Sequence, residues 1–164
     1  MQEILIINTG GTFNKRYDPL KGELLVPDDS LALEEILKHF HNLNYKILNT
    51  IHKDSLDMTD DDRKVIAREI KSSSQKKILI IHGTDTMDKT ADFLDNQIKG
   101  RCIVLTGAMV PFSIDVTEAT ANFSLAIGYM LNKQENGVYM AMHGLVSEHS
   151  KIFKNRSRGV FEKI

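Results

Sequence analysis

Three short segments of the sequence combine glycine with threonine, and each one directly follows a run of apolar residues. They are residues 8–12 (NTGGT), residues 82–86 (HGTDT) and residues 106–109 (TGAM). Glycine lets the backbone approach a ligand and present its N–H groups, and a threonine hydroxyl can donate, accept or attack. The second segment adds the carboxylate of Asp85. Together these segments predict a site for a small polar molecule.

A tight turn between a strand and a helix is a sufficient explanation for any one of these segments. It is a weaker explanation for three of them, because the carboxyl ends of parallel strands share one edge of a sheet, where ligands bind. The phosphate-binding patterns G-x-G-x-x-G and G-x-x-x-x-G-K-[ST] are absent from the sequence. A threonine hydroxyl is a poor nucleophile at neutral pH and needs a nearby proton acceptor, a role that a suitably placed lysine can fill.

The elements that must position these segments alternate along the chain. Apolar, β-rich runs predict strands at residues 4–7, 46–50, 77–81, 103–105 and 138–142. A first helix is predicted after Ser30 as its N-cap, because apolar residues recur at helical spacing (Leu33, Ile36, Leu37, Phe40). A second is predicted after Thr59 as its N-cap (Val65, Ile66, Ile70). Residues 87–98 and 117–131 predict two more helices.

Two of the strand runs are apolar at nearly every position, which is typical of strands covered on both faces. Alternation of such strands with helices predicts right-handed βαβ units. We therefore expect an α/β fold with three layers, in which a doubly wound, mostly parallel sheet is flanked by helices. No linker or repeat divides the sequence, so we expect one domain over residues 1–164.

The composition excludes several classes of function. The chain has 164 residues, a net charge of −1 and 41% hydrophobic residues, which is ordinary for a globular domain and offers no basic patch for nucleic acid or anionic lipid. No apolar run is long enough to span a membrane. The single cysteine, Cys102, favours a reducing compartment and a cytoplasmic location. The six histidines show no metal-ligand spacing. We expect no metal and no cofactor.

The motifs resemble those of the bacterial-type L-asparaginase and glutaminase family. The segments TGGT (9–12) and HGTDTM (82–87) resemble its two signature motifs, DSLDMT (54–59) its substrate-binding segment, and TGAM followed by Pro111 its G-A-M-x-P turn. Glu118 and Asn122 fall where the family has an acid and an asparagine that open the next helix. Lys154 lies at the spacing of the family's catalytic lysine.

The resemblance implies hydrolysis of a side-chain amide, with release of ammonia. It implies that Thr12 attacks, that Tyr17 closes over the substrate and assists Thr12, and that Lys154 polarises Thr84. The substrate's α-amino group is then bound by Asp85. Gly11, Ser55 and Ala108 are the other implied substrate-binding residues. Other interpretations stay open: Lys154 as a surface charge, Tyr17 as a packing residue and His82 as a structural residue.

The sequence also departs from the family pattern. Leu56 follows Ser55 where the family often has a polar residue, and Val110 precedes Pro111 where an arginine is common. Family members generally carry a second domain, which these 164 residues do not contain. We therefore expect self-association into a homo-oligomer, with a dimer favoured. The alternative to an enzyme is an amino-acid-binding module that does not catalyse, or a subunit that needs a second domain for activity.

Overall fold

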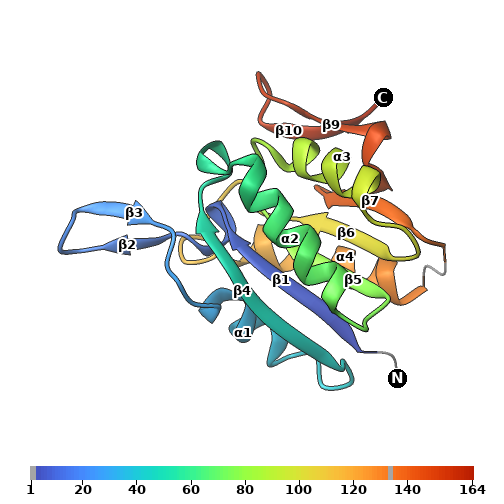
Figure 1. The fold of residues 1–164 in the computed structure, drawn as a ribbon. Helices are drawn as coiled ribbons and strands as arrows, with labels where there is room; N and C mark the ends of the chain where they lie inside the picture. The colour runs from blue at the N-terminus through green and yellow to red at the C-terminus, as the bar shows by residue number, and fades with distance from the viewer. Residues whose placement is uncertain (1–2, 133–134) are drawn as a thin grey trace.

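A six-stranded sheet forms the centre of the computed structural model, which describes residues 3–132 and 135–164 (Figure 1). The strand order is β4-β1-β5-β6-β7-β8, and only the edge strand β8 is antiparallel to its neighbour. All five predicted strands are present, most of them longer than predicted. Their bounds are β1 Ile4–Gly10, β4 Tyr45–Lys53, β5 Lys77–Ile81, β6 Cys102–Thr106, β7 Gly137–Met142 and β8 Leu145–Glu148.

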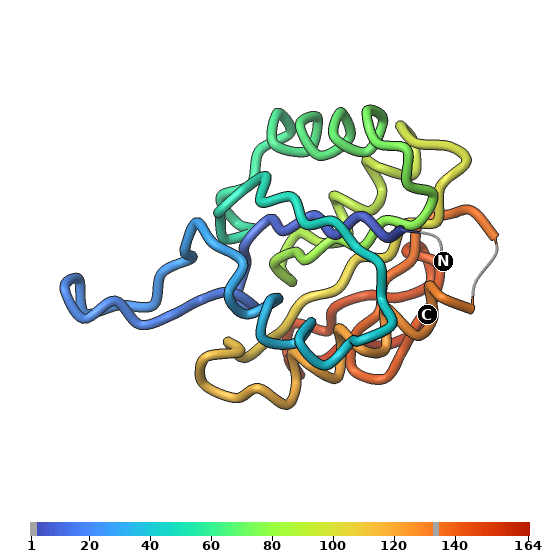
Figure 2. The backbone as a smooth tube through the Cα atoms, turned by 90° about the horizontal axis from the view of Figure 1, so that it is seen from below, coloured from blue at the N-terminus to red at the C-terminus, as the bar shows by residue number. Residues whose placement is uncertain are grey.

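Helices cover both faces of the sheet, so the predicted three-layer α/β fold is confirmed (Figure 2). Successive residues of β1 point to opposite faces: Leu5 and Ile7 pack in one core cluster, and Ile4 and Ile6 pack in the other. The helices α2 and α3 cover the first face, whereas α1 and α4 cover the second. The helix bounds are α1 Leu31–Leu37, α2 Asp60–Ser72, α3 Met87–Gln97 and α4 Val116–Asn132.

The two predicted helix caps differ in outcome. Thr59 forms a capping box at the start of α2, in which it exchanges hydrogen bonds with Asp62. Ser30 lies at the N-cap of α1, but its hydroxyl donates to the Glu34 carboxylate at 2.6 Å and caps no backbone N–H. The helix also ends before Phe40, which packs edge-on against Phe123 instead.

One connection contradicts the prediction that every βαβ unit is right-handed. From β5 to β6 the chain passes through α3 on one face, and from β6 to β7, in the same direction, it passes through α4 on the other. The unit β6-α4-β7 therefore has the opposite hand to the other three. Its long first connection, residues 107–115, crosses the carboxyl edge, where the Phe112 N–H donates to the Phe13 carbonyl at 3.3 Å. This detour lets α4 begin on the second face.

Two hairpins lie outside the sheet. The first joins β2 (Arg16–Asp18) to β3 (Glu23–Leu25) and projects from the body (Figure 2). The second joins β9 (Ile152–Asn155) to β10 (Val160–Lys163). Neither was predicted from the sequence. No helix among the described residues is long and apolar enough to cross a membrane.

Candidate active site

The sheet order places a crevice at the carboxyl ends of β1 and β5. From β1 the chain moves in one direction to β4, and from β5 it moves in the other to β6 and β7. Such a reversal is the point where open α/β sheets bind their ligands, because the loops that leave the two strands turn to opposite faces. The segments after β1 and β5 carry Thr12 and Thr84.

Two glycines bring these segments into backbone contact. A Cβ atom built on Gly11 would lie 2.5 Å from the Gly83 nitrogen, so no side chain fits between the two turns. Gly11 also has a φ of 73°, a conformation that favours glycine. Thr12 and Thr84 each follow one of these glycines. The predicted gathering of the two threonine motifs is therefore present in the fold.

Thr12 is the first residue of a short 3₁₀ turn, η1 (Thr12–Asn14), whose last residue bonds to the end of β1. The buried Asn14 side chain donates to the Gly10 carbonyl at 2.7 Å and to Asn8 Oδ1 at 2.9 Å. Thr12 itself is partly exposed, and no hydrogen bond of its hydroxyl is found among the described residues. A fixed backbone thus presents a free hydroxyl.

Thr84, Asp85 and Lys154 meet in one polar cluster. Lys154 extends from β9, and its Nζ donates to Thr84 Oγ1 and to Asp85 Oδ1, both at 2.8 Å. Its side chain is only 12% exposed. Lys154 is therefore not an ordinary surface charge. The Thr84 hydroxyl donates to Met109 Sδ at 3.4 Å, which is a weak acceptor.

Arg156, which was not among the predicted site residues, also contacts this cluster. Its Nη1 donates to Asp85 Oδ1 at 2.8 Å and its Nη2 to the Asp85 carbonyl at 2.7 Å. Hydrogen bonding and charge from Lys154 first, and then from Arg156, hold the pKa of Asp85 below its usual range despite partial burial. The available signal was the two-residue spacing from Lys154, which is the period of a strand.

Ser55 lies beside Thr84, in the 3₁₀ turn η2 (Ser55–Asp57). Its buried hydroxyl accepts hydrogen bonds from the N–H groups of Asp85 and Thr86 at 3.2 and 3.3 Å. A Cβ atom on Gly83 would clash with Ser55. The Ser55 hydroxyl thus supports the turn and keeps its own proton available to a ligand.

A buried polar network supports the same turn from behind. Arg63 donates to the hydroxyls of Thr90 at 3.0 Å and Thr86 at 3.2 Å, although the α2 pattern predicted no buried charge there. His82 contacts Thr90 Oγ1 and the Gly83 carbonyl, both at 2.7 Å. Burial lowers the pKa of His82 to about 4, so the ring is neutral. These contacts support the interpretation of His82 as a structural residue.

The third glycine-threonine segment is held by α4. Glu118 accepts hydrogen bonds from the N–H groups of Met109 at 2.8 Å and Val110 at 3.0 Å. Asn122 donates to the Gly107 carbonyl at 3.0 Å. Ala108 is buried in the core, so only its main chain is available to a ligand.

Tyr17 is not brought to the other site residues. It lies on the projecting hairpin with its side chain 64% exposed, and no hydrogen bond of its hydroxyl is found in the described part of the chain. Tyr17 pairs with Leu24 across this hairpin. Arg16 anchors its base by a two-point ion pair with Asp29 at 2.8 and 2.6 Å.

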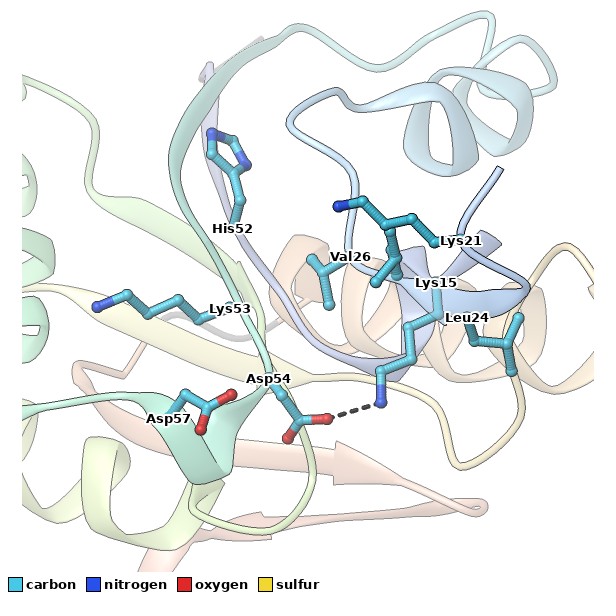
Figure 3. Close-up of a pocket in the computed structure, with 9 residues that line it drawn as sticks. Lys15, Lys21, Leu24, Val26, His52, Lys53, Asp54 and Asp57 are labelled. Atoms are coloured by element: carbon cyan, nitrogen blue, oxygen red, sulfur yellow. Dashed lines mark hydrogen bonds and ion pairs between the residues drawn. The ribbon is translucent and has the colours of Figure 1, made fainter. Parts of the chain in front are cut away.

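A pocket of about 440 Å³ separates the hairpin from the end of β4 (Figure 3). Lys15 and Asp54 form an ion pair at 2.6 Å across it. Leu24 and Val26 line the hairpin side. Since Asp54 immediately precedes Ser55, this ion pair links the base of the hairpin to the turn that carries Ser55. Among the described residues, no group of three or more His, Cys, Asp or Glu side chains could hold a metal ion.

Comparison with known proteins identifies the family of this chain. The family model for the N-terminal domain of asparaginase matches residues 3–161. L-asparaginase 1 of Escherichia coli is 29% identical over 169 residues, which cover 94% of this chain and 45% of that protein. A glutamyl-tRNA(Gln) amidotransferase subunit of Methanococcus maripaludis is 31% identical over 153 residues, which cover 88% of this chain and 35% of that protein. This chain thus spans less than half of the length of these relatives.

A solved structure shares the fold. The thermostable L-asparaginase from Thermococcus kodakarensis superposes with a TM-score of 0.87 at 24% identity, over 99% of this chain and 51% of that one. The resemblance inferred from the motifs is confirmed, and the chain belongs to the asparaginase family, of which it represents the N-terminal domain.

Proposed function

We propose that this chain carries the catalytic residues of an asparaginase-type amidohydrolase. It hydrolyses the side-chain amide of L-asparagine, L-glutamine or a related small amide to the acid and ammonia. The observation that carries the proposal is the hydrogen bond from Lys154 to Thr84, next to the free hydroxyl of Thr12. A module that only binds an amino acid needs neither an attacking hydroxyl nor a threonine polarised by a lysine.

The cluster offers a complementary group for each end of such a substrate. Asp85 keeps a negative charge that can bind the α-ammonium group. The Ser55 hydroxyl proton can be donated to the α-carboxylate. The main chain of Gly11 and Ala108 lies at the same edge and offers backbone groups for further contacts.

Thr12 performs the first chemical step in this proposal. Its Oγ1 forms a bond to the amide carbon, the C–N bond breaks, and the Thr12 proton leaves with the nitrogen as ammonia. Water then attacks the ester, the C–O bond breaks, and the Thr12 hydroxyl is restored as the acid leaves. Both steps pass through an oxyanion, and each backbone N–H that stabilises it contributes about 3–4 kcal/mol.

Thr84 assists as a proton donor. Because Lys154 donates to its oxygen, the Thr84 hydroxyl is polarised and becomes a stronger donor. Its present acceptor is the Met109 sulfur, a weak one that a substrate oxygen or nitrogen can replace. Tyr17 reaches the site when the hairpin closes over the substrate, and it relays the Thr12 proton.

Ammonia release from a panel of amides tests this proposal. The panel contains L-asparagine, L-glutamine and succinamate, which is asparagine without its α-amino group. We expect release from at least one of them, and none above background from the Thr12→Val variant. Binding of L-aspartate without ammonia release from any amide would identify the chain as a binding module or as a subunit that needs a second domain.

The remaining expectations stay predictions. The expected partner is a small-molecule amide, with no nucleic acid and no membrane, and the expected location is the cytoplasm. We also expect self-association into a homo-oligomer, with a dimer favoured. Light scattering at micromolar concentration tests the self-association, and a species of 18.6 kDa alone would contradict it.

A further inference from the structure

Arg156 holds Asp85 by two different atoms of that residue. It follows β9 directly, and its guanidinium reaches the carboxylate Oδ1 at 2.8 Å and the main-chain carbonyl at 2.7 Å. A planar guanidinium makes such a two-point contact, whereas an ammonium acts as a point charge. The pair of contacts therefore fixes the Asp85 side chain relative to its own backbone.

The two cations of the site converge on the same carboxylate oxygen. Lys154 Nζ and Arg156 Nη1 both donate to Asp85 Oδ1 at 2.8 Å. No hydrogen bond to Asp85 Oδ2 is found among the described residues. The last torsion of an aspartate is soft, and Lys154 alone, which also serves Thr84, would leave the carboxylate free to turn. With Arg156 in place, Oδ2 stays open for a ligand.

We propose that Arg156 is a positioning residue that fixes the Asp85 carboxylate for a substrate ammonium group, and so makes the site selective for amides that carry a free α-amino group. This inference rests on the proposed function, in which Asp85 binds that group. The positive charge of Arg156 opposes an incoming ammonium, but its side chain is 61% exposed, so solvent and salt screen the repulsion. The orienting effect therefore dominates.

A matched pair of variants tests the proposal. Arg156→Gln removes the two-point contact. Arg158→Gln is the control, because Arg158 lies on the same hairpin, is 70% exposed and pairs with Glu162 instead. Arg156→Lys keeps the charge and loses the planar geometry. KM and kcat are measured for each variant with L-asparagine and with succinamate.

We expect Arg156→Gln to raise KM for L-asparagine about five- to tenfold, with kcat within about twofold and KM for succinamate unchanged. Arg156→Lys retains part of the wild-type affinity for L-asparagine, and Arg158→Gln leaves KM for both substrates unchanged. The loss of Arg156 also raises the pKa of Asp85, so the acid limb of kcat/KM for L-asparagine moves to higher pH.

Equal changes in KM for the two substrates would show a general structural role and overturn the proposal, as would no change for L-asparagine. If the parent protein releases no ammonia from either amide, the proposed function fails on its own. Calorimetric binding of L-aspartate and of succinate then replaces KM. The proposal predicts that Arg156→Gln weakens the binding of L-aspartate but not that of succinate. Equal weakening of both, or no weakening of L-aspartate binding, contradicts it.

Discussion

The two sides of the candidate site are held in place very differently. Thr84 is 7% exposed, and its segment is supported by Lys154, Ser55 and a buried arginine network. Tyr17 is 64% exposed on a hairpin whose ion pairs to the body, among the described residues, lie at its base. One side of the site is built into the core of the fold, and the other stands apart from it.

This difference matches two requirements of catalysis. Groups that stabilise charge in a transition state must be oriented in advance, and buried hydrogen bonds provide that orientation. A substrate must also enter and leave, which requires a part of the site with few contacts to the body. In the proposed mechanism the strand ends supply the fixed groups, and Tyr17 on the β2–β3 hairpin is the group that arrives with the substrate.

The largest effect is expected for Thr12, which lies where the two sides meet. Thr12→Val removes the attacking oxygen with little change in shape, so kcat falls by about three orders of magnitude or more while the fold is retained. Steady-state kinetics and circular dichroism measure the two quantities. Wild-type turnover in folded Thr12→Val protein would remove Thr12 from the mechanism.

The next prediction concerns the side of the site that is built into the core, called here the fixed side, and tests whether its residues Thr84 and Lys154 act as one unit. Thr84→Val and Lys154→Met should each reduce kcat by about two to three orders of magnitude. Because Lys154 acts through Thr84, the double variant should cost little more than either single one. Additive losses in the double-mutant cycle would mean that the two residues act independently.

A smaller loss is expected on the hairpin. Tyr17→Phe removes one exposed hydroxyl, so kcat/KM should fall about 10- to 100-fold, with the free energy of unfolding unchanged within about 0.5 kcal/mol. Leu24→Ala is the control, because Leu24 pairs with Tyr17 across the hairpin. If Leu24→Ala costs as much activity as Tyr17→Phe, the hairpin acts through its shape and not through the tyrosine hydroxyl.

The smallest effect is a pH dependence of stability from the fixed side. His82 in the unfolded chain gains a proton below about pH 6.5, whereas burial lowers its pKa in the folded protein to about 4. His82 therefore does not reduce the free energy of unfolding above pH 6.5. As the pH falls from 6.5 toward 4, protonation of His82 in the unfolded chain lowers the free energy of unfolding by at most about 1.4 kcal/mol per pH unit. Urea unfolding at several pH values measures this loss.

His82→Gln provides the comparison for that measurement, because other groups titrate in the same range. The free energy of unfolding of this variant should change less between pH 6.5 and pH 4 than that of the parent protein. An NMR titration of the His82 ring gives a second reading on the parent protein itself. A ring that titrates near pH 6.5 in the folded protein contradicts the account of a buried, neutral histidine.

The fixed side was largely predictable from the sequence, and the hairpin was not. Glycine and threonine directly after apolar runs identify Thr12 and Thr84, because buried strands and tight turns have strong local signals. The residues of β2 and β3 are polar or lack a two-residue alternation, so nothing local indicated a hairpin. Its strands pair with each other and contribute nothing to the main sheet.

Three features depended on tertiary contacts that no local pattern records. The buried guanidinium of Arg63 finds hydrogen-bond acceptors in Thr86 and Thr90, which come from the start of α3. Arg156 reaches Asp85 only because the second hairpin folds back over the site. The hand of the β6-α4-β7 connection is set by the path of residues 107–115 across the sheet edge. The positions of the candidate site residues were therefore more predictable from the sequence than the contacts that support them.

Trapping of the covalent intermediate tests the central claim most directly, that Thr12 and not Thr84 is the nucleophile. The protein is mixed with L-asparagine, quenched in acid within its first turnovers, digested, and analysed by peptide mass spectrometry. We expect an aspartyl ester on the peptide that contains Thr12, which is absent from the Thr12→Val variant and from protein without substrate. An ester on the peptide that contains Thr84, or rapid ammonia release with no ester on either threonine, would contradict this account.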